Sequence, residues 1–408
     1  MKKWTAGLLA VLMAFSITAC GAEDTNVPVD SSAQESTVES VEESVVESSE
    51  ATETSETEEV IDTETLKYLY GERGIKAGTC LSEQMLQNGR VQTIIKTNFN
   101  SITLENNLKP EVILSKNASQ ASGELTVEFT PATTNLLDWC VENDMALRGH
   151  TLVWYSQTPN WIFYEDFDES KALVSREVML ERMESFIRQT FEKLEAGGYL
   201  EHFYAYDVVN EAWMEDGTKR DCLWLKTIGD DYMWYAFHYA DKYAPEYVDL
   251  YYNDYNEQFK TETLYNFVQT LVDDEGKSLI DGIGLQAHLY TEDDMDEYLS
   301  TVERLGSTGL KVNLTELDIC LGSWPVIAPK TKANQRAQGR HYYNLVNGLF
   351  QLVDEGKVKM DSLTFWGIND QMSWRRERNP ALFDNLNMPK FAYYGAMQMQ
   401  DKAGFDEE

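Results

Sequence analysis

The stretch "YAYDVVNEAW", residues 204–213, combines a buried strand with a polar end. Its first half has the β-forming and apolar residues of a buried strand, and it ends on Asn210 and Glu211. An amide and a carboxylate are poor material for a buried core, but they are the residues expected where a strand delivers side chains to a site.

Seven further β-rich runs have the same design, and helical patterns separate them. The eight runs are "GIKAGTCL" (74–81), "SITLEN" (101–106), "ALRGHTLVW" (146–154), "YDVVNE" (206–211), "DLYYNDYN" (249–256), "GIGLQAHLY" (282–290), "KVNLTELDI" (311–319) and "SLTFWGIND" (362–370). The clearest helical pattern covers 171–196, where apolar residues recur at three and four positions until Gly197 and Gly198. Eight strand–helix units over residues 62–408 predict a single (β/α)8 TIM barrel.

The carboxyl ends of the expected strands carry polar or aromatic residues almost without exception. These ends form the active face of a (β/α)8 barrel. Packing does not require such residues at one end of so many strands, so we expect one active site there. The residues are Glu105, Asn106, Lys109, His150, Trp154, Asn210, Glu211, Asn253, Asp254, Asn256, Gln286, His288, Glu316, Asp318, Trp366 and Asp370.

The motifs of other chemistries are missing from the sequence. The histidines have no HxH or HExxH spacing, no glycine-rich phosphate loop follows a strand, and there is no G-x-S-x-G stretch. We therefore expect no catalytic metal and no cofactor. A pair of carboxylates among amides and tryptophans suits the hydrolysis of carbohydrate.

Seven segments, in order along the chain, resemble glycoside hydrolase family 10, the endo-β-1,4-xylanases. They are "ENNLK" (105–109), "RGHTLVW" (148–154), "DVVNEAW" (207–213), "YNDYN" (252–256), "GIGLQAH" (282–288), "TELDI" (315–319) and "FWGINDQMSWR" (365–375). The resemblance implies hydrolysis of xylan with retention of configuration. It implies that Glu211 is the general acid/base and Glu316 the nucleophile.

The resemblance also implies supporting roles. Asn210 would bind the sugar 2-hydroxyl, and His288, held by Asp318, would orient Glu316. The residues implied to bind substrate, together with Asn253 at the end of its strand, are Glu105, Asn106, Lys109, His150, Trp154, Gln286, Trp366 and Trp374. Tyr206 and Asn369 depart from the usual family residues, and Asn369 is expected to alter the detail of a subsite.

Chemistry from the residues themselves agrees with these roles and leaves alternatives. A glycosidic oxygen needs a proton donor, and an oxocarbenium-like transition state needs a carboxylate on the opposite face. Asp318 could also be the nucleophile, but it should lie deeper than Glu316. A barrel β-glucanase, an aryl-glycosidase and a catalytically silent sugar-binding lipoprotein are the other functions that the pattern allows.

The net charge of −35 argues against nucleic acid as a partner, because phosphates would be repelled. Residues 21–60 carry 13 Asp or Glu and no Lys or Arg. Such a segment cannot bury enough apolar surface to fold, so we expect 21–61 to be a disordered linker, although an interaction tail is possible. The catalytic domain is expected to be a monomer.

The first twenty residues are typical of an export signal. Lys2 and Lys3 precede an apolar run, 8–17, that is too short to span a bilayer. The run ends in "SITAC", which resembles a bacterial lipobox and predicts lipidation of Cys20. The protein would then be held at the cell surface by its lipid, although an ordinary cleaved signal and a secreted protein are alternatives.

Four cysteines remain in the predicted catalytic domain. They are Cys80, Cys140, Cys222 and Cys320, and none of them forms a C-x-x-C pair. An exported domain could pair them, but we expect free buried thiols.

Overall fold

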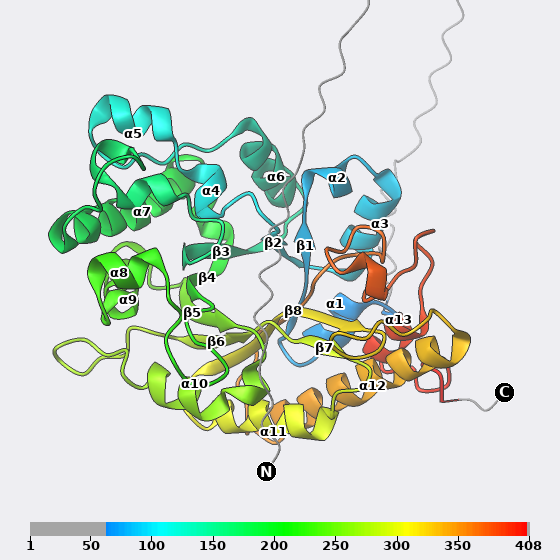
Figure 1. The fold of residues 1–408 in the computed structure, drawn as a ribbon. Helices are drawn as coiled ribbons and strands as arrows, with labels where there is room; N and C mark the ends of the chain where they lie inside the picture. Colours follow the sequence, from blue (N-terminus) through cyan, green and yellow to red (C-terminus); the bar gives the residue numbers. More distant parts are fainter. Residues whose placement is uncertain (1–62, 406–408) are drawn as a thin grey trace, which may run out of the picture. The chain divides into compact units, whose positions relative to one another are not determined.

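The computed structural model describes residues 63–405 (Figure 1). The predicted signal peptide (1–20), Cys20 and the acidic linker (21–61) lie outside the described residues and remain predictions. Among residues 63–405, no helix is both long enough and apolar enough to cross a bilayer.

Eight parallel strands form a closed ring at the centre of the molecule, which confirms the predicted (β/α)8 barrel (Figure 1). The ring runs β1-β2-β3-β4-β5-β6-β8-β9 and closes through the pairing of β9 with β1. The strands are β1 (Lys76–Leu81), β2 (Ser101–Leu104), β3 (Ala146–Trp154), β4 (Phe203–Asn210), β5 (Asp249–Asp254), β6 (Gly282–Leu285), β7 (His288–Tyr290), β8 (Lys311–Cys320) and β9 (Ser362–Phe365).

The sixth expected strand, 282–290, is divided in two. It stops after Leu285 and resumes at His288 as the short strand β7, which pairs only with β8. Between the two strands, Ala287 has a left-handed backbone with φ of 55°. The prediction of one continuous strand here is wrong, because the backbone turns at this alanine.

Strand β8 contains one more residue than its neighbours require. Leu285 pairs with Leu314 and His288 with Asp318, so residues 286 and 287 face three residues of β8. The pairing of β8 with β9 shifts over the same residues. The result is a β-bulge that contains Glu316, and bulges of this kind redirect a side chain next to a site.

Helices surround the ring (Figure 1). The α-helices are α1 (Leu66–Gly71), α2 (Glu83–Leu86), α3 (Gly89–Asn98), α4 (Pro110–Ile113), α5 (Lys116–Ser122), α6 (Pro131–Glu142), α7 (Arg176–Ala196), α8 (Leu223–Ile228), α9 (Tyr232–Tyr243), α10 (Thr261–Val268), α11 (Met295–Gly306), α12 (Lys332–Asp354) and α13 (Phe391–Ala396). Short 3-10 helices are η1 (Asn160–Phe163), η2 (Glu165–Phe167), η3 (Leu200–His202), η4 (Glu257–Phe259) and η5 (Arg376–Arg378).

The helix expected over 171–196 begins five residues later, at Arg176. The Ser175 hydroxyl accepts a hydrogen bond from the Val178 N–H, so it caps the helix and fixes its start. Gly198, with φ of 73°, follows the end of the helix, as the two glycines predict.

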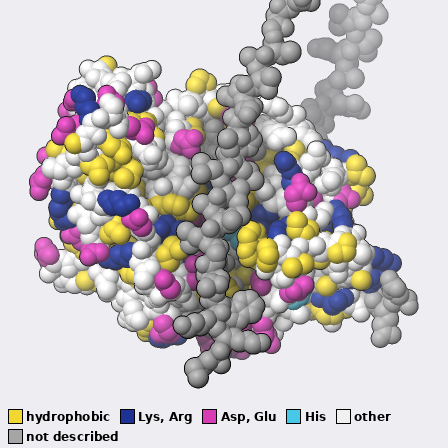
Figure 2. Space-filling view, in the orientation of Figure 1, with side chains coloured by type: hydrophobic (Ala, Val, Ile, Leu, Met, Phe, Trp, Pro, Cys, Tyr) yellow, Lys and Arg dark blue, Asp and Glu magenta, His cyan; other side chains and the backbone are white. Residues whose placement is uncertain are grey.

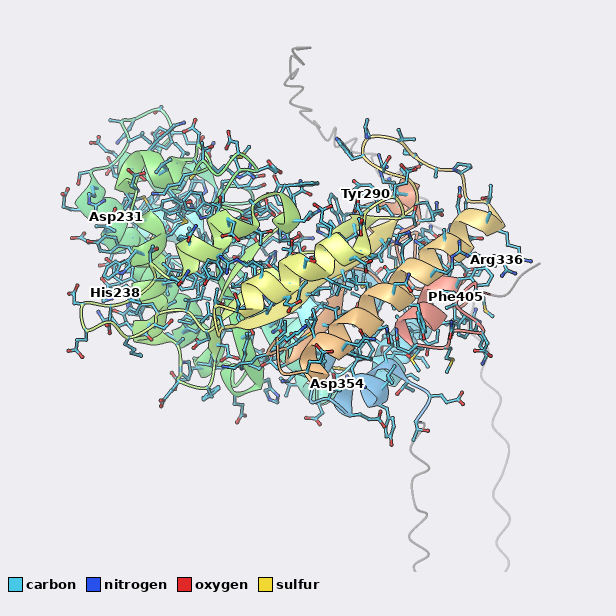
Figure 3. The ribbon with its side chains drawn as sticks, turned by 90° about the horizontal axis from the view of Figure 1, so that it is seen from below. Asp231, His238, Tyr290, Arg336, Asp354 and Phe405 are labelled. Atoms are coloured by element: carbon cyan, nitrogen blue, oxygen red, sulfur yellow. The ribbon has the colours of Figure 1, made fainter. Side chains whose placement is uncertain are left out.

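Viewed from below, α12 runs from the side of Arg336 toward Asp354 (Figure 3). Tyr290, the last residue of β7, lies at the end of the barrel where α12 begins near Arg336. Asp354, the last residue of α12, lies toward the other end. The mouth formed by the strand ends is therefore on the side of Tyr290.

The apolar core lies between the ring of strands and the helices. Tyr206, one of the departures from the family pattern, is fully buried there and packs against Phe191 and Phe203. A Cβ atom at Gly149 would meet the Tyr206 ring at 2.2 Å, so the glycine makes room for this tyrosine. The departure is absorbed by packing outside the barrel.

The four cysteines of the described residues are free and buried. This confirms the expectation of unpaired thiols for Cys80, Cys140, Cys222 and Cys320. They occupy β1, α6, the residue before α8, and β8.

Candidate active site

The two predicted catalytic carboxyls lie at the mouth of the barrel. Glu211 directly follows β4, and Glu316 lies in the bulge of β8, three places further round the ring. Only 8% of Glu211 and 6% of Glu316 is exposed. Both carboxyls are therefore nearly out of contact with bulk water. In this buried environment hydrogen bonds and charges act more strongly than they do in water.

Two side-chain amides connect these carboxyls. The Asn210 Nδ2 donates to Glu211 Oε1 at 3.2 Å, and Asn253 Nδ2 donates to both Asn210 Oδ1 and Glu316 Oε1, each at 2.9 Å. The Thr315 hydroxyl donates to Asn253 Oδ1 at 2.6 Å and fixes the orientation of that amide. The positions of the two carboxyls are therefore coupled through Asn210 and Asn253.

That Asn253 binds substrate stays a prediction. Its side chain is fully buried and its amide group is occupied by Asn210, Glu316 and Thr315. It lies at the expected strand end, and its contacts in the structure are with Glu316 and with the amide that bonds Glu211.

His288 links Glu316 to a second buried charge pair. Its Nε2 lies 3.5 Å from Glu316 Oε2, and its Nδ1 lies 3.0 Å from Asp318 Oδ1. Arg375 Nη1 donates to the same Asp318 oxygen at 2.5 Å. The structure brings His288, Asp318 and Glu316 together, and it adds Arg375. Sequence reasoning missed that residue, because "SWRRERN" does not tell which arginine turns inward.

Burial opposes ionisation of Glu316, but a hydrogen bond from His288, the charges of His150 and His288, and a hydrogen bond from Asn253 lower its pKa to about 2. Burial likewise opposes the charge of His288, but Asp318 and Glu316 raise its pKa to about 9. Glu316 is thus held as a carboxylate, the form that a nucleophile needs. Asp318, only 1% exposed and paired with Arg375, is more deeply buried than Glu316 and is a poorer candidate for attack.

The contribution of the Glu316–His288 pair to the free energy of unfolding is expected to be largest, and nearly constant, over an intermediate range of pH. A depressed acid pKa stabilises the fold above the unfolded value of 4.5, and this contribution disappears as pH falls toward about 2. A raised histidine pKa stabilises below 6.5, and this contribution disappears as pH rises through about 9. Urea unfolding of the native chain and of Glu316→Gln should therefore differ most between pH 4.5 and 6.5. A difference that does not change between pH 3 and pH 9 would contradict the pairing.

Glu211 is held by its backbone as well as by its side chain. It has a left-handed conformation with φ of 55°, which is costly for a residue other than glycine. Its carbonyl accepts from Arg220 Nε at 2.8 Å, and its Oε1 accepts from Gln286 Nε2 at 2.9 Å. Gln286, predicted to bind substrate, is 97% buried and contacts Glu211 directly. Arg220 carried no signal in the sequence.

A group of polar residues lies beside Trp154 at the ends of β2 and β3. Lys109 Nζ donates to Asn106 Oδ1 and to Gln157 Oε1, both at 2.9 Å, and lies 5.0 Å from the Trp154 ring centre. Burial raises the pKa of Glu105 and lowers that of Lys109. The predicted residues Glu105, Asn106, Lys109 and Trp154 thus share one side of the mouth, and Gln157 was missed.

Two tryptophan rings contact the two histidines of the site edge-to-face. The Trp366 ring contacts His150 edge-to-face at 5.9 Å, and the Trp374 ring contacts His288 at 5.1 Å. Trp366 is buried, whereas Trp374 is 61% exposed. Exposed aromatic faces at a polar mouth suit the apolar faces of sugar rings.

Asn369 acts on the loop between these two tryptophans. Its Oδ1 accepts from the Met372 N–H at 2.9 Å, and its Nδ2 donates to Asn387 Oδ1 at 2.7 Å. The departure from the family pattern at this position therefore affects how the Trp374 loop is held.

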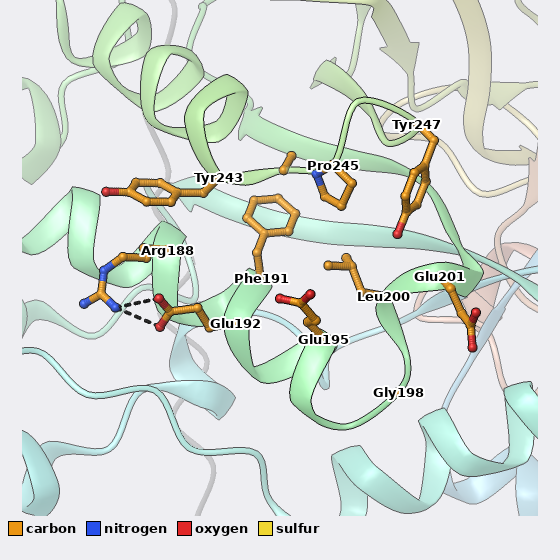
Figure 4. A pocket seen from close by; sticks show the side chains of 11 residues that line it. Arg188, Phe191, Glu192, Glu195, Gly198, Leu200, Glu201, Tyr243, Pro245 and Tyr247 are labelled. Atoms are coloured by element: carbon orange, nitrogen blue, oxygen red, sulfur yellow. Dashed lines mark hydrogen bonds and ion pairs between the residues drawn. The ribbon is translucent and has the colours of Figure 1, made fainter.

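A further pocket lies away from the barrel mouth. Figure 4 shows a pocket of about 540 Å³ between α7 and α9, with Tyr243, Pro245 and Tyr247 above Phe191 and Leu200. It contains none of the predicted site residues. The face shown in Figure 2 mixes acidic, basic and hydrophobic side chains, so no single-sign surface points to a charged partner there.

Known proteins resemble this chain over most of the described residues. The bifunctional endo-1,4-beta-xylanase XylA of Ruminococcus flavefaciens is 38% identical over 334 residues, which are 79% of this chain and 33% of that protein. The endo-1,4-beta-xylanase B of Paenibacillus barcinonensis is 34% identical over 337 residues, 78% of this chain and 93% of that protein. This chain thus spans about a third of the Ruminococcus relative and almost all of the Paenibacillus one.

A solved structure gives the same result for the fold. The CBM22-1–GH10 modules of the Clostridium thermocellum endo-1,4-beta-D-xylanase 10B, complexed with xylohexaose, match with a TM-score of 0.74 and 31% identity. The match covers 82% of this chain and 68% of that one. The sequence profile of glycosyl hydrolase family 10 matches residues 65–399. From the barrel, the two carboxyls at its mouth and this match, we conclude that the chain belongs to glycosyl hydrolase family 10.

Proposed function

We propose that this protein hydrolyses internal β-1,4-xylosidic bonds of xylan by a retaining double displacement. The observation that carries the proposal is the unequal environment of two coupled carboxyls. Glu316 is held ionised by His288, whereas Glu211 lies on a strained turn beside neutral amides. The xylanases among its relatives support xylan as the substrate.

In the first step Glu211 gives its proton to the glycosidic oxygen while a Glu316 oxygen forms a bond to the anomeric carbon. The bond to the leaving sugar breaks, and a glycosyl-enzyme ester remains on Glu316. In the second step Glu211, now a carboxylate, takes a proton from water, which attacks the same carbon and releases Glu316. Two inversions leave the β-configuration unchanged.

The surrounding residues make this exchange of roles possible. The Asn253 amide and the His288 imidazolium stabilise the charge of Glu316 before attack and after release. Asp318 and Arg375 fix the ring of His288, so that its Nε2 stays aimed at Glu316. Lys109, Asn106 and Gln157 offer hydrogen bonds to sugars, and the exposed Trp374 ring offers a stacking face.

One assay tests the substrate and the mechanism together. Purified protein is incubated with xylan, mixed-linkage glucan and cellulose, and the product sizes are measured. Xylo-oligosaccharides of mixed length are expected from xylan, and the first product seen by proton NMR is the β-anomer. Faster hydrolysis of glucan would favour a β-glucanase, whereas an initial α-anomer would exclude Glu316 as nucleophile.

We also propose that the enzyme is anchored at the cell surface by a lipid on Cys20, with the acidic linker as a spacer. This proposal is supported by Lys2, Lys3 and the apolar run 8–17, by the lipobox-like "SITAC" and by the acidic segment that follows. The native protein should remain with membranes after cell breakage and partition into detergent, because acyl chains bind the bilayer. Cys20→Ser should release the protein or block its processing. Recovery of the native protein from the medium, cleaved elsewhere, would exclude the anchor.

A further inference from the structure

One short turn contacts both carboxyls of the site. Gln286 Nε2 donates to Glu211 Oε1 at 2.9 Å, and His288 Nε2 lies 3.5 Å from Glu316 Oε2. Only Ala287 separates them in the chain. A change in the backbone of this one residue would move the partners of both carboxyls at the same time.

The conformation of Ala287 is not one that alanine prefers. Its φ is 55°, and a residue with a Cβ atom pays about 1–2 kcal/mol for left-handed backbone. The turn also matches the extra residue of β8, because the Ala287 carbonyl accepts from the Asp318 N–H at 3.3 Å. Such a conformation persists only where its surroundings hold it.

A buried carboxyl holds this turn from behind. Glu257, in η4 after β5, accepts the Ala287 N–H on its Oε1 at 3.2 Å. Its Oε2 accepts the Tyr298 hydroxyl of α11 at 3.4 Å. Glu257 is 1% exposed and contacts neither Glu211 nor Glu316 by any hydrogen bond within the described residues.

The charged neighbours of Glu257 are few. Asp254 and Lys260 lie on its own segment and are paired with each other at 2.7 Å, and Tyr298 faces it from α11. Burial raises the pKa of Glu257 to about 7, against the hydrogen bonds that it accepts. In either protonation state one oxygen remains able to accept the Ala287 N–H, so a neutral side chain with that oxygen can replace the carboxyl.

We propose that Glu257 is a positioning residue for both carboxyls. By accepting the Ala287 N–H, it holds the left-handed turn that aims Gln286 at Glu211 and His288 at Glu316. This inference rests on the proposed function, since it concerns the same two carboxyls.

Two substitutions separate the hydrogen bond from the charge. Glu257→Gln keeps the accepting oxygen and the length of the side chain, so its kcat on xylohexaose should stay within about threefold of the native value. Glu257→Met keeps the length but loses the acceptor. Its kcat should fall roughly 10–10²-fold with little change in KM, because the reacting groups are displaced while the sugar subsites remain.

Ala287→Gly distinguishes a positioning role of Glu257, which acts through the turn, from a general contribution of Glu257 to stability. Glycine adopts left-handed backbone without a steric cost, so the turn depends less on its anchor. The loss in kcat caused by Glu257→Met should be several-fold smaller in a chain that carries Ala287→Gly. Tyr298→Phe is the matched control, because it removes the other hydrogen bond of the same carboxyl and leaves Ala287 held.

Amide hydrogen exchange over residues 286–289 supplies a readout independent of activity. Exchange should be faster in Glu257→Met than in Glu257→Gln and Tyr298→Phe. Native kcat in Glu257→Met, equal losses in all three variants, or no effect of Ala287→Gly would overturn the inference. Should Glu257→Met fail to fold, the variant with both Glu257→Met and Ala287→Gly is compared with Ala287→Gly alone. A native protein inactive on xylohexaose would refute the proposed function, while exchange would still decide whether Glu257 holds the turn.

Discussion

Alanine at Glu211 and alanine at Glu316 are expected to fail in different ways on a substrate with a good leaving group. On xylan, loss of Glu211 should lower the rate about 10²–10⁴-fold, the usual scale of general acid catalysis, and loss of Glu316 at least as much. A nitrophenyl xylobioside leaves without protonation. Glu211→Ala should therefore form its glycosyl-enzyme rapidly and then turn over slowly, which gives a burst of nitrophenol.

Azide distinguishes the two variants further. It attacks without a general base, so it should restore turnover of Glu211→Ala and yield a β-glycosyl azide. Glu316→Ala has no carboxylate to form the ester, so it should show no burst, and any azide product should be the α-anomer. Stopped-flow absorbance and NMR of the product provide the measurements. If the two variants behave alike, or if their behaviours are exchanged, the roles assigned to the ends of β4 and β8 are wrong.

Methionine in place of Arg148 is expected to cost about 3–5 kcal/mol of the free energy of unfolding, since it leaves a buried carboxylate without its cation. Arg148 and Asp207 are each 1% exposed, and Arg148 Nε donates to Asp207 at 3.3 Å. Asp207 would keep only His150, whose Nδ1 lies 2.9 Å away. Urea unfolding at pH 7 measures the loss, and xylanase activity reports whether His150 moves.

The exposed pair Arg188–Glu192 on α7 provides the control. It also joins a guanidinium to a carboxylate, with 2.7 Å between Arg188 Nη1 and Glu192 Oε2, but both side chains are at least one-third exposed. Arg188→Met should cost less than about 0.5 kcal/mol. Comparable losses in the two variants would mean that burial does not determine the effect, and the account of Arg148 would be incorrect.

The barrel, and the place of most candidate site residues at its mouth, could be predicted because each strand has a recognisable pattern in the sequence. Each strand of a (β/α)8 barrel is a short apolar run, and its polar end marks the mouth. Glu211 and Glu316 stand at such ends, and the structure places both of them there. His288 and Asp318 were also predicted as partners, and their side chains are 3.0 Å apart.

The turn at Ala287 could not be predicted, because alanine carries no signal for left-handed backbone. The run "GIGLQAHLY" has the composition of one continuous strand, and the turn that divides it is held by contacts with Glu257 and β8. The burial of Asn253 could not be predicted for a related reason. A strand end fixes which residues are near the mouth, but not which of them other side chains cover.

The four buried thiols can serve as built-in reporters of local unfolding in the barrel. Burial raises the pKa values of Cys80, Cys140, Cys222 and Cys320, so a thiol reagent meets almost no thiolate while the fold is closed. Each thiol becomes reactive only when its own element separates from the core. They belong to β1, α6, the start of α8 and β8. The order in which they are alkylated, measured by mass spectrometry, would therefore reveal which of these four elements opens first, with no probe added to the chain.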